Sequence, residues 1–210
     1  PGRIYVPSDI SSAAFFIVAA LIIPGSNIII KKVGINPTRT GILEVLKRMG
    51  ARISIKNRSR SSGELFADLE VKSSVLNAVV INNSEIPSLI DELPILMMAS
   101  AFAKGRTLIK GAGELRVKET DRIKSISYNL SRLGVHSRVI SHNGDEDIEI
   151  TGSQPQGGAS LKSFSDHRTA MSAVIGALAC KNPSELDDIS CVSKSFPEFM
   201  SVLNHLLGNK

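Results

Sequence analysis

The sequence predicts an α/β domain in which a β-α-β-α-β-β unit is used two and a half times, giving pseudo-threefold symmetry. Three observations predict this. An Ala-rich apolar segment led by Asp occurs three times, starting at Asp9, Asp91 and Asp166. Each is followed by a segment with helical apolar spacing and then Gly, and alternating strands close the first two copies. No linker divides the chain, so residues 1–210 are predicted to form one domain.

Each copy contains a helix that we expect to be buried. The segments after Asp9, Asp91 and Asp166 are apolar on nearly all faces, which is typical of a buried helix. An Asp carboxylate can accept hydrogen bonds from the free N–H groups of a first turn. By this pattern Asp91 is an N-cap, like the other two.

A second, amphipathic helix follows in each copy, with one apolar stripe at spacings of three and four. The three stripes and the glycines that end them are Ile42, Val45, Leu46, Met49 and Gly50; Ile123, Ile126, Leu130, Leu133 and Gly134; and Phe199, Val202, Leu203, Leu206 and Gly208.

The strands complete the unit. We expect leading strands at 4–6, 79–81 and 160–164, Gly-led strands at 25–34, 105–113 and around 186–193, period-two strands at 65–71 and 148–150, and hairpin loops at 58–63 and 141–144. The third copy stops after its amphipathic helix and lacks closing strands.

Composition and net charge indicate which classes of binding partner suit this chain. Of 210 residues, 42% are hydrophobic and 21% charged, which suits a chain that buries its own core. Lys and Arg exceed Asp and Glu by 25 to 20, a surplus that fits nucleic acid, acidic membranes or small anions. Aromatic residues make up only 4%, without Trp, so bases have little to stack on. Small anionic substrates are therefore favoured over nucleic acid.

Cysteine usage and hydropathy predict a reduced, cytoplasmic protein. Cys180 and Cys191 are too few for a disulfide framework or metal cluster. The longest apolar run, 13–24, is shorter than the roughly 20 residues of a membrane span, and Asp9 replaces the basic flank of a signal peptide. Because the chain starts at Pro1 almost directly on a strand, we expect it to begin partway through a longer protein.

The densest charged cluster lies at 115–122. Lys118, Glu119 and Arg122 share one face if the helix has begun there. A helix N-terminus with nearby cations is a plausible anion site. The alternative is a solvated first turn with internal ion pairs.

Two further junctions carry candidates. His167 and Arg168 lie in the first turn of an otherwise apolar helix, where burying polar side chains costs free energy unless they face a polar cleft. The alternative is that Asp166 caps the helix and both side chains reach solvent. Lys194 occupies the same place in copy three as the 115–122 cluster does in copy two, unless it is simply exposed. If the pseudo-symmetry brings these junctions together, they form a cationic cleft with acid/base groups for a small phosphate- or carboxylate-bearing substrate.

Six motifs carry a family resemblance: Asp9–Phe16, Asn36–Gly41, Asp91–Leu96, Leu115–Arg122, Ser165–Met171 and Ser193–Phe199. In them the sequence resembles the 5-enolpyruvylshikimate-3-phosphate synthase family, over essentially all 210 residues but only the C-terminal half of the family's length. The resemblance implies an inside-out, enolpyruvyl transferase-like lobe of three β-α-β-α-β-β units with helices turned inward, completed by strands from the family's N-terminus.

The resemblance also implies a reaction: the 5-hydroxyl of shikimate 3-phosphate adds to phosphoenolpyruvate, and phosphate is then eliminated, without metal or organic cofactor. The implied roles are Asp91 as proton acceptor and shikimate 3-phosphate contact, Lys118 as a second contact to that substrate, Arg122, Arg168 and Lys194 as phosphoenolpyruvate ligands, and Glu119 and His167 at the reacting centre.

The sequence departs from the family in two motifs. Ser8 replaces the usual Gly before Asp9, and Glu114 stands where some members place a substrate-binding Asn. The family's N-terminal lobe, which supplies half of the site, is the implied partner, so we expect the isolated chain to be inactive and the full-length protein to be a monomeric glyphosate target. The alternative is a non-catalytic anion-binding or assembly domain with the same fold.

Overall fold

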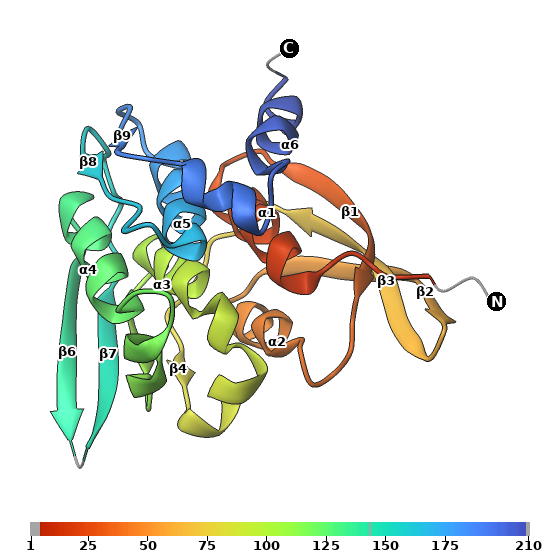
Figure 1. Cartoon of the computed structure of the whole chain (residues 1–210), viewed down its shortest axis with the longest axis horizontal. Coiled ribbons are helices and arrows are strands. Elements are labelled where there is room, and N and C mark those ends of the chain that lie inside the picture. Colours follow the sequence, from red (N-terminus) through yellow and green to blue (C-terminus); the bar gives the residue numbers. More distant parts are fainter. Residues whose placement is uncertain (1–4, 143, 209–210) are drawn as a thin grey trace.

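Three helices form the centre of the computed structural model, which describes residues 5–142 and 144–208. They are α1 (Ile10–Ile22), α3 (Leu93–Ala101) and α5 (His167–Leu178), and each packs against the other two (Figure 1). All nine residues of α3 are buried, as its all-round apolar sequence predicts. The expectation of helices turned inward is confirmed.

The strands lie outside these helices in three sheets. The first has the order β1 (Asn27–Gly34), β3 (Glu64–Lys72), β2 (Arg52–Ser61), and the second the order β4 (Val80–Ile81), β5 (Arg106–Ile109), β7 (Asp145–Thr151), β6 (His136–His142). The third pairs β8 (Ser160–Leu161) with β9 (Glu185–Leu186). The first sheet and the β6–β7 hairpin lie at opposite ends of the long axis (Figure 1).

The pairing directions confirm the repeat. Each unit begins with a parallel contact: the isolated bridge Ser8–Val33, then β4 with β5, then β8 with β9. The first two units continue with antiparallel closing strands. The third unit, in the described residues, has its opening pair alone.

The amphipathic helices lie between the central helices and the surface. They are α2 (Gly41–Arg48), α4 (Arg122–Arg132) and α6 (Phe199–Leu206). The predicted stripes of the first two are buried, but Val202 and Leu206 on α6 are exposed. Gly50, Gly134 and Gly208 all have positive φ, as expected of C-terminal stops.

Several strand predictions were wrong in extent. Tyr5 and Val6 are not in a strand, Ile4 lies outside the described residues, and the third leading strand ends at Leu161. The segment 105–113 is a strand only over β5 and continues into the 3₁₀ helix η3 (Gly113–Val117); the third Gly-led segment is β9 followed by η4 (Ser190–Lys194).

The predicted hairpin loops were also too long. Arg58 to Ser61 belong to β2, and Ser141 and His142 belong to β6, while Asn143 lies outside the described residues. Both strands are at sheet edges, where ladder hydrogen bonds form with one neighbour and polar side chains face solvent. The polar residues at these strand ends therefore led the sequence pattern to predict loops.

Candidate active site

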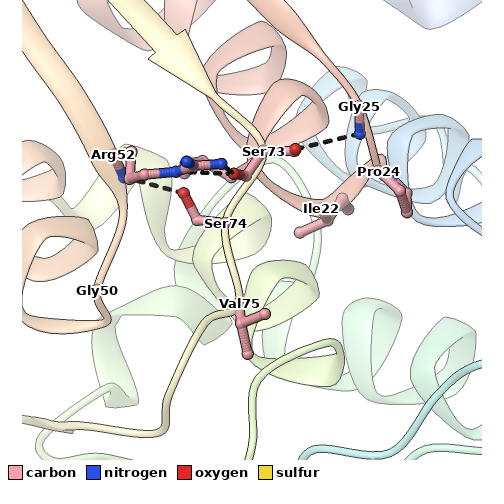
Figure 2. A pocket seen from close by; sticks show the side chains of 9 residues that line it. Ile22, Pro24, Gly25, Gly50, Arg52, Ser73, Ser74 and Val75 are labelled. Carbon is pink, nitrogen blue, oxygen red and sulfur yellow. Dashed lines mark hydrogen bonds between the residues drawn. The ribbon is translucent and has the colours of Figure 1, made fainter.

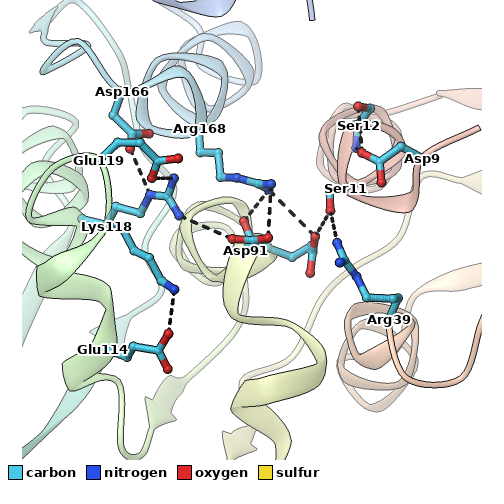
Figure 3. Close-up of polar contacts among 12 residues, drawn as sticks. Asp9, Ser11, Ser12, Arg39, Asp91, Glu114, Lys118, Glu119, Asp166 and Arg168 are labelled. Carbon is cyan, nitrogen blue, oxygen red and sulfur yellow. Dashed lines mark hydrogen bonds and ion pairs between the residues drawn. The ribbon is translucent and has the colours of Figure 1, made fainter. Parts of the chain in front are cut away.

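The helix starts of the three units meet in one polar cluster. It includes residues at the beginnings of α1 and α5, the 3₁₀ turn η2 (Ile90–Glu92) that leads into α3, and the loops before α2 and α4 (Figure 3). The prediction that pseudo-symmetry brings the junctions together is confirmed for most of them.

Arg122 is the buried centre of the cluster. Its side chain is 1% exposed, and its guanidinium faces three carboxylates: Asp166 (Nε–Oδ2 3.0 Å), Glu119 (Nη2–Oε2 2.5 Å) and Asp91 (Nη1–Oδ1 3.7 Å). A buried cation requires such compensation. The solvated first turn expected as an alternative at this position is therefore wrong for Arg122.

Arg168 lies beside it at the first turn of α5. Its Nη1 donates to the Asp91 backbone carbonyl at 2.8 Å, and its Nη2 lies 3.4 Å from Asp91 Oδ2. The side chain is 15% exposed. Arg168 therefore faces the polar cluster rather than open solvent.

The N-cap prediction for Asp91 is wrong. Asp9 and Asp166 do cap their helices, accepting from the backbone N–H groups of Ser12 and Thr169 at 2.8 Å. Asp91 instead lies in η2, and α3 begins two residues later at Leu93. Its carboxylate faces two guanidinium groups instead of a helix end, and its side chain remains 35% exposed.

The second helix of this unit has not begun at Lys118, contrary to one of the two expectations for the cluster at 115–122. α4 starts at Arg122, with Asp121 as an N-cap that accepts from the Lys124 N–H at 3.0 Å. Lys118 and Glu119 precede it in a loop, and Glu119 contacts Arg122 from there rather than from a helix face. Lys118 Nζ pairs with Glu114 at 2.6 Å.

His167 is the first residue of α5 and is half-buried. Burial lowers the pKa of His167 below its ordinary value of 6.5, with Arg168 and Arg122 acting in the same direction and Asp166 and Glu119 against it. At neutral pH the imidazole is therefore predominantly neutral and able to accept a proton.

Lys194 is exposed at the end of η4, an element that packs against α5. It forms no ion pair with any residue in 5–142 or 144–208. The alternative of an exposed lysine thus describes the position of Lys194 in this structure.

Three members of the cluster were missed from the sequence. Ser11 Oγ donates to Glu92 Oε1 at 2.5 Å, and Arg39 Nη2 donates to Ser11 Oγ at 3.2 Å. Glu92 is only 2% exposed. The sequence signal for a buried Glu92 was its position directly before a nine-residue apolar helix. An acidic residue there is buried along with the helix unless the chain turns toward solvent.

A pocket of about 410 Å³ lies elsewhere, between the end of α1 and the loops beside β2 and β3 (Figure 2). Arg52 donates there to the Ser73 carbonyl, and the Gly25 N–H donates to Ser73 Oγ at 3.1 Å. These hydrogen bonds connect the loops that line the pocket. None of the lining residues belongs to the polar cluster.

The described part of the chain contains neither a group of three or more His, Cys, Asp or Glu side chains placed to hold a metal ion nor a helix able to span a membrane.

Helices turned inward and sheets turned outward give this chain the fold of the enolpyruvyl transferases. The enolpyruvyl transferase NikO from Streptomyces tendae has the same fold, with a TM-score of 0.70 at 18% identity over 93% of this chain and 42% of that one. An EPSP synthase from Acinetobacter baumannii superimposes with a TM-score of 0.89 at 40% identity, over 97% of this chain and 46% of that one.

Within that class, residues 1–203 match the EPSP synthase (3-phosphoshikimate 1-carboxyvinyltransferase) family, and the chain belongs to it. It is 48% identical over 201 residues to the 3-phosphoshikimate 1-carboxyvinyltransferase of Geotalea daltonii, covering 96% of this chain and 46% of that protein. The Synechococcus elongatus protein of the same name is 49% identical over 205 residues, covering 98% and 45%. The chain thus spans less than half the length of these curated relatives.

Proposed function

We propose that this chain, as part of a longer protein, transfers the enolpyruvyl group of phosphoenolpyruvate to the 5-hydroxyl of shikimate 3-phosphate and releases phosphate. The observation that carries the proposal is the Asp91 carboxylate held between the guanidinium groups of Arg122 and Arg168. Guanidinium groups bind carboxylates and phosphates with paired hydrogen bonds, and both substrates carry both groups. Family membership supports the same activity.

The proposed roles follow the position of each group. Arg168 and Arg122 bind phosphoenolpyruvate, with Lys194 joining them from η4. Lys118 and Asp91 contact shikimate 3-phosphate. Glu119, which already contacts Arg122, lies with His167 beside the reacting centre.

In the proposed reaction the 5-hydroxyl oxygen attacks C2 of phosphoenolpyruvate and gives its proton to Asp91, while C3 takes up a proton from solvent. The tetrahedral intermediate then loses phosphate from C2 and a proton from C3, which restores the double bond. His167 supports this exchange, because an imidazole of lowered pKa is neutral at neutral pH and can accept a proton. The arginines stabilise the charge on the departing phosphate.

We further propose that an N-terminal lobe of the same protein completes the site, and that the full-length protein acts as a monomer in the cytoplasm. The chain covers 46% of the Geotalea daltonii relative, so a second lobe of similar size fits the remainder. Arg168 and Asp91 keep part of their surface exposed on the side where substrates would bind.

The experiment measures phosphate release from phosphoenolpyruvate and shikimate 3-phosphate by the isolated 210-residue chain and by the full-length protein. We expect turnover from the full-length protein alone. Turnover by the isolated chain would contradict the need for a second lobe. A full-length protein that binds both substrates without releasing phosphate would favour a non-catalytic anion-binding domain.

A further inference from the structure

Glu92 is a buried carboxylate at the edge of the polar cluster that the proposed reaction does not use. It ends η2 and precedes α3, and its side chain is 2% exposed. Its Oε1 accepts a hydrogen bond from Ser11 Oγ at 2.5 Å and lies 3.9 Å from Arg168 Nη1. Arg39 Nη2 donates to the same Ser11 oxygen at 3.2 Å.

These contacts join all three repeat units. Ser11 belongs to α1 in the first unit, Glu92 to the second and Arg168 to α5 in the third, while Arg39 comes from the loop before α2 (Figure 3). Capping of α3 does not explain the carboxylate at this position, because the Glu92 side chain accepts no hydrogen bond from the first turn of that helix.

The two edges of the Arg168 guanidinium have different surroundings. Nη1 is held by the Asp91 backbone carbonyl at 2.8 Å and faces Glu92 at 3.9 Å. Nη2 faces the Asp91 carboxylate at 3.4 Å, on the partly exposed side. Both edges therefore contact the protein, but only the Nη2 edge faces a partly exposed group, the Asp91 carboxylate, whose side chain is 35% exposed and can give up this contact to a substrate anion.

We propose that Glu92 is a positioning residue that holds Arg168, through one edge of its guanidinium, in the orientation that binds the anionic substrate. This inference rests on the proposed function. The substrate concerned carries a carboxylate and a phosphate, as phosphoenolpyruvate does. Ser11 and Arg39 in turn hold the Glu92 carboxylate.

The electrostatics of Glu92 argue against a role in stability. Burial raises the pKa of Glu92 above its ordinary value of 4.5, and Asp91 adds to that effect. Ser11, Arg168 and Arg39 oppose it. Because the unfolded chain loses this proton first, the free energy of unfolding falls as pH rises from about 4.5 through the raised pKa. Above that window an ionised Glu92 lowers stability.

The test compares wild type with Glu92→Gln in the full-length protein. Gln keeps the shape and an oxygen that accepts from Ser11, but it removes the charge facing Arg168. We expect the KM for phosphoenolpyruvate to rise about five- to tenfold with kcat within about twofold, as for loss of one ground-state contact. We also expect the thermal unfolding midpoint at pH 8 to rise, because burial raises the pKa of Glu92, which means that folding disfavours its ionised form, and Gln is uncharged.

The matched control is Glu64→Gln, at an exposed position at the start of β3, which should leave KM and the unfolding midpoint unchanged. Ser11→Ala should also raise KM, by about threefold, since the hydrogen bond that Ser11 donates to the Glu92 carboxylate is lost. A Glu92→Gln protein with a lower midpoint and an unchanged KM would overturn the inference in favour of a structural role.

A wild-type protein without turnover would contradict the proposed function separately. In that case, calorimetric Kd values for phosphoenolpyruvate decide the inference. Weaker binding to Glu92→Gln than to wild type supports it, and equal binding or none to either overturns it.

Discussion

Three aspartates in equivalent sequence positions have different surroundings. Among the described residues, Asp9 accepts from its own helix alone, Asp166 accepts from its helix with one oxygen and from Arg122 with the other, and Asp91 pairs with Arg122 and Arg168 without capping a helix. The local pattern of Asp before an apolar helix is the same in each case. The roles differ because Asp91 lies in η2, two residues before α3, and because the two guanidinium groups that it faces come from elsewhere in the chain.

Replacing Asp91 should separate activity from stability. In the full-length protein we expect Asp91→Ala to lower kcat by about 10²- to 10⁴-fold, the usual effect of removing a proton acceptor. Its unfolding midpoint should stay within a few degrees of wild type, since no helix cap is lost. Steady-state phosphate release and thermal unfolding measure the two effects, and Asp9→Ala, which removes a true cap, is the control for stability. Lower stability with near-normal turnover would restore the cap interpretation.

His167 should make stability depend on pH. Its pKa is lowered in the folded chain, so the unfolded chain binds the proton more readily. The free energy of unfolding should therefore rise with pH from the lowered pKa up to about 6.5 and then level off. Urea unfolding from pH 4 to 8 of wild type and of His167→Gln measures this as a difference, and the difference should be constant above about pH 7. A pH-independent difference would show that His167 titrates alike in both states.

Among the elements, the close approach of α3 and α5 depends on one glycine. A Cβ added at Gly176 would overlap Met98 Sδ and Cγ, and Met98 is completely buried on α3. The sequence marks Gly176 only as one small residue among several alanines. Its neighbour across the interface is 78 positions away in the chain, so no local pattern reveals it.

Gly176→Ala should therefore lower the free energy of unfolding by about 1–3 kcal/mol, through overpacking, even though Ala is the better helix former. Chemical denaturation measures the change. The double substitution Gly176→Ala with Met98→Ala should be less destabilised than the sum of the single changes, because the overlap is gone. Strict additivity would mean that Gly176 does not limit the approach.

In the molecule as a whole, three inward helices share one core, and each sheet covers one side of it. The prediction of a single domain over residues 1–210 follows from the absence of any linker in the sequence. It implies that the three units unfold together.

Unfolding of the isolated chain should therefore be one cooperative transition. Far-ultraviolet circular dichroism and tyrosine fluorescence should give the same midpoint, and the calorimetric and van't Hoff enthalpies should agree. Tyrosine is the appropriate fluorophore, because the sequence has two Tyr and no Trp. Two separated transitions would divide the chain into more than one domain.

The repeat, the inward helices and most amphipathic stripes could be predicted from the sequence, because apolar periodicity expresses which face of an element is buried. Strand ends at the sheet edges could not, since polar residues such as Arg58 serve equally in a loop or an edge strand. The charged residues near Arg122 were predicted, but the burial of Arg122 itself was not.

The sequence alone established the helices, their order and the residue types available at each junction, because these depend on neighbours three or four positions away. The direction of Asp91, the burial of Arg122 and the existence of the Glu92 contact depended on the folded chain. Arg122 meets Asp166 across 44 positions, Arg168 meets Asp91 across 77 and Ser11 meets Glu92 across 81. Charges pair through space, and folding alone brings those partners within range.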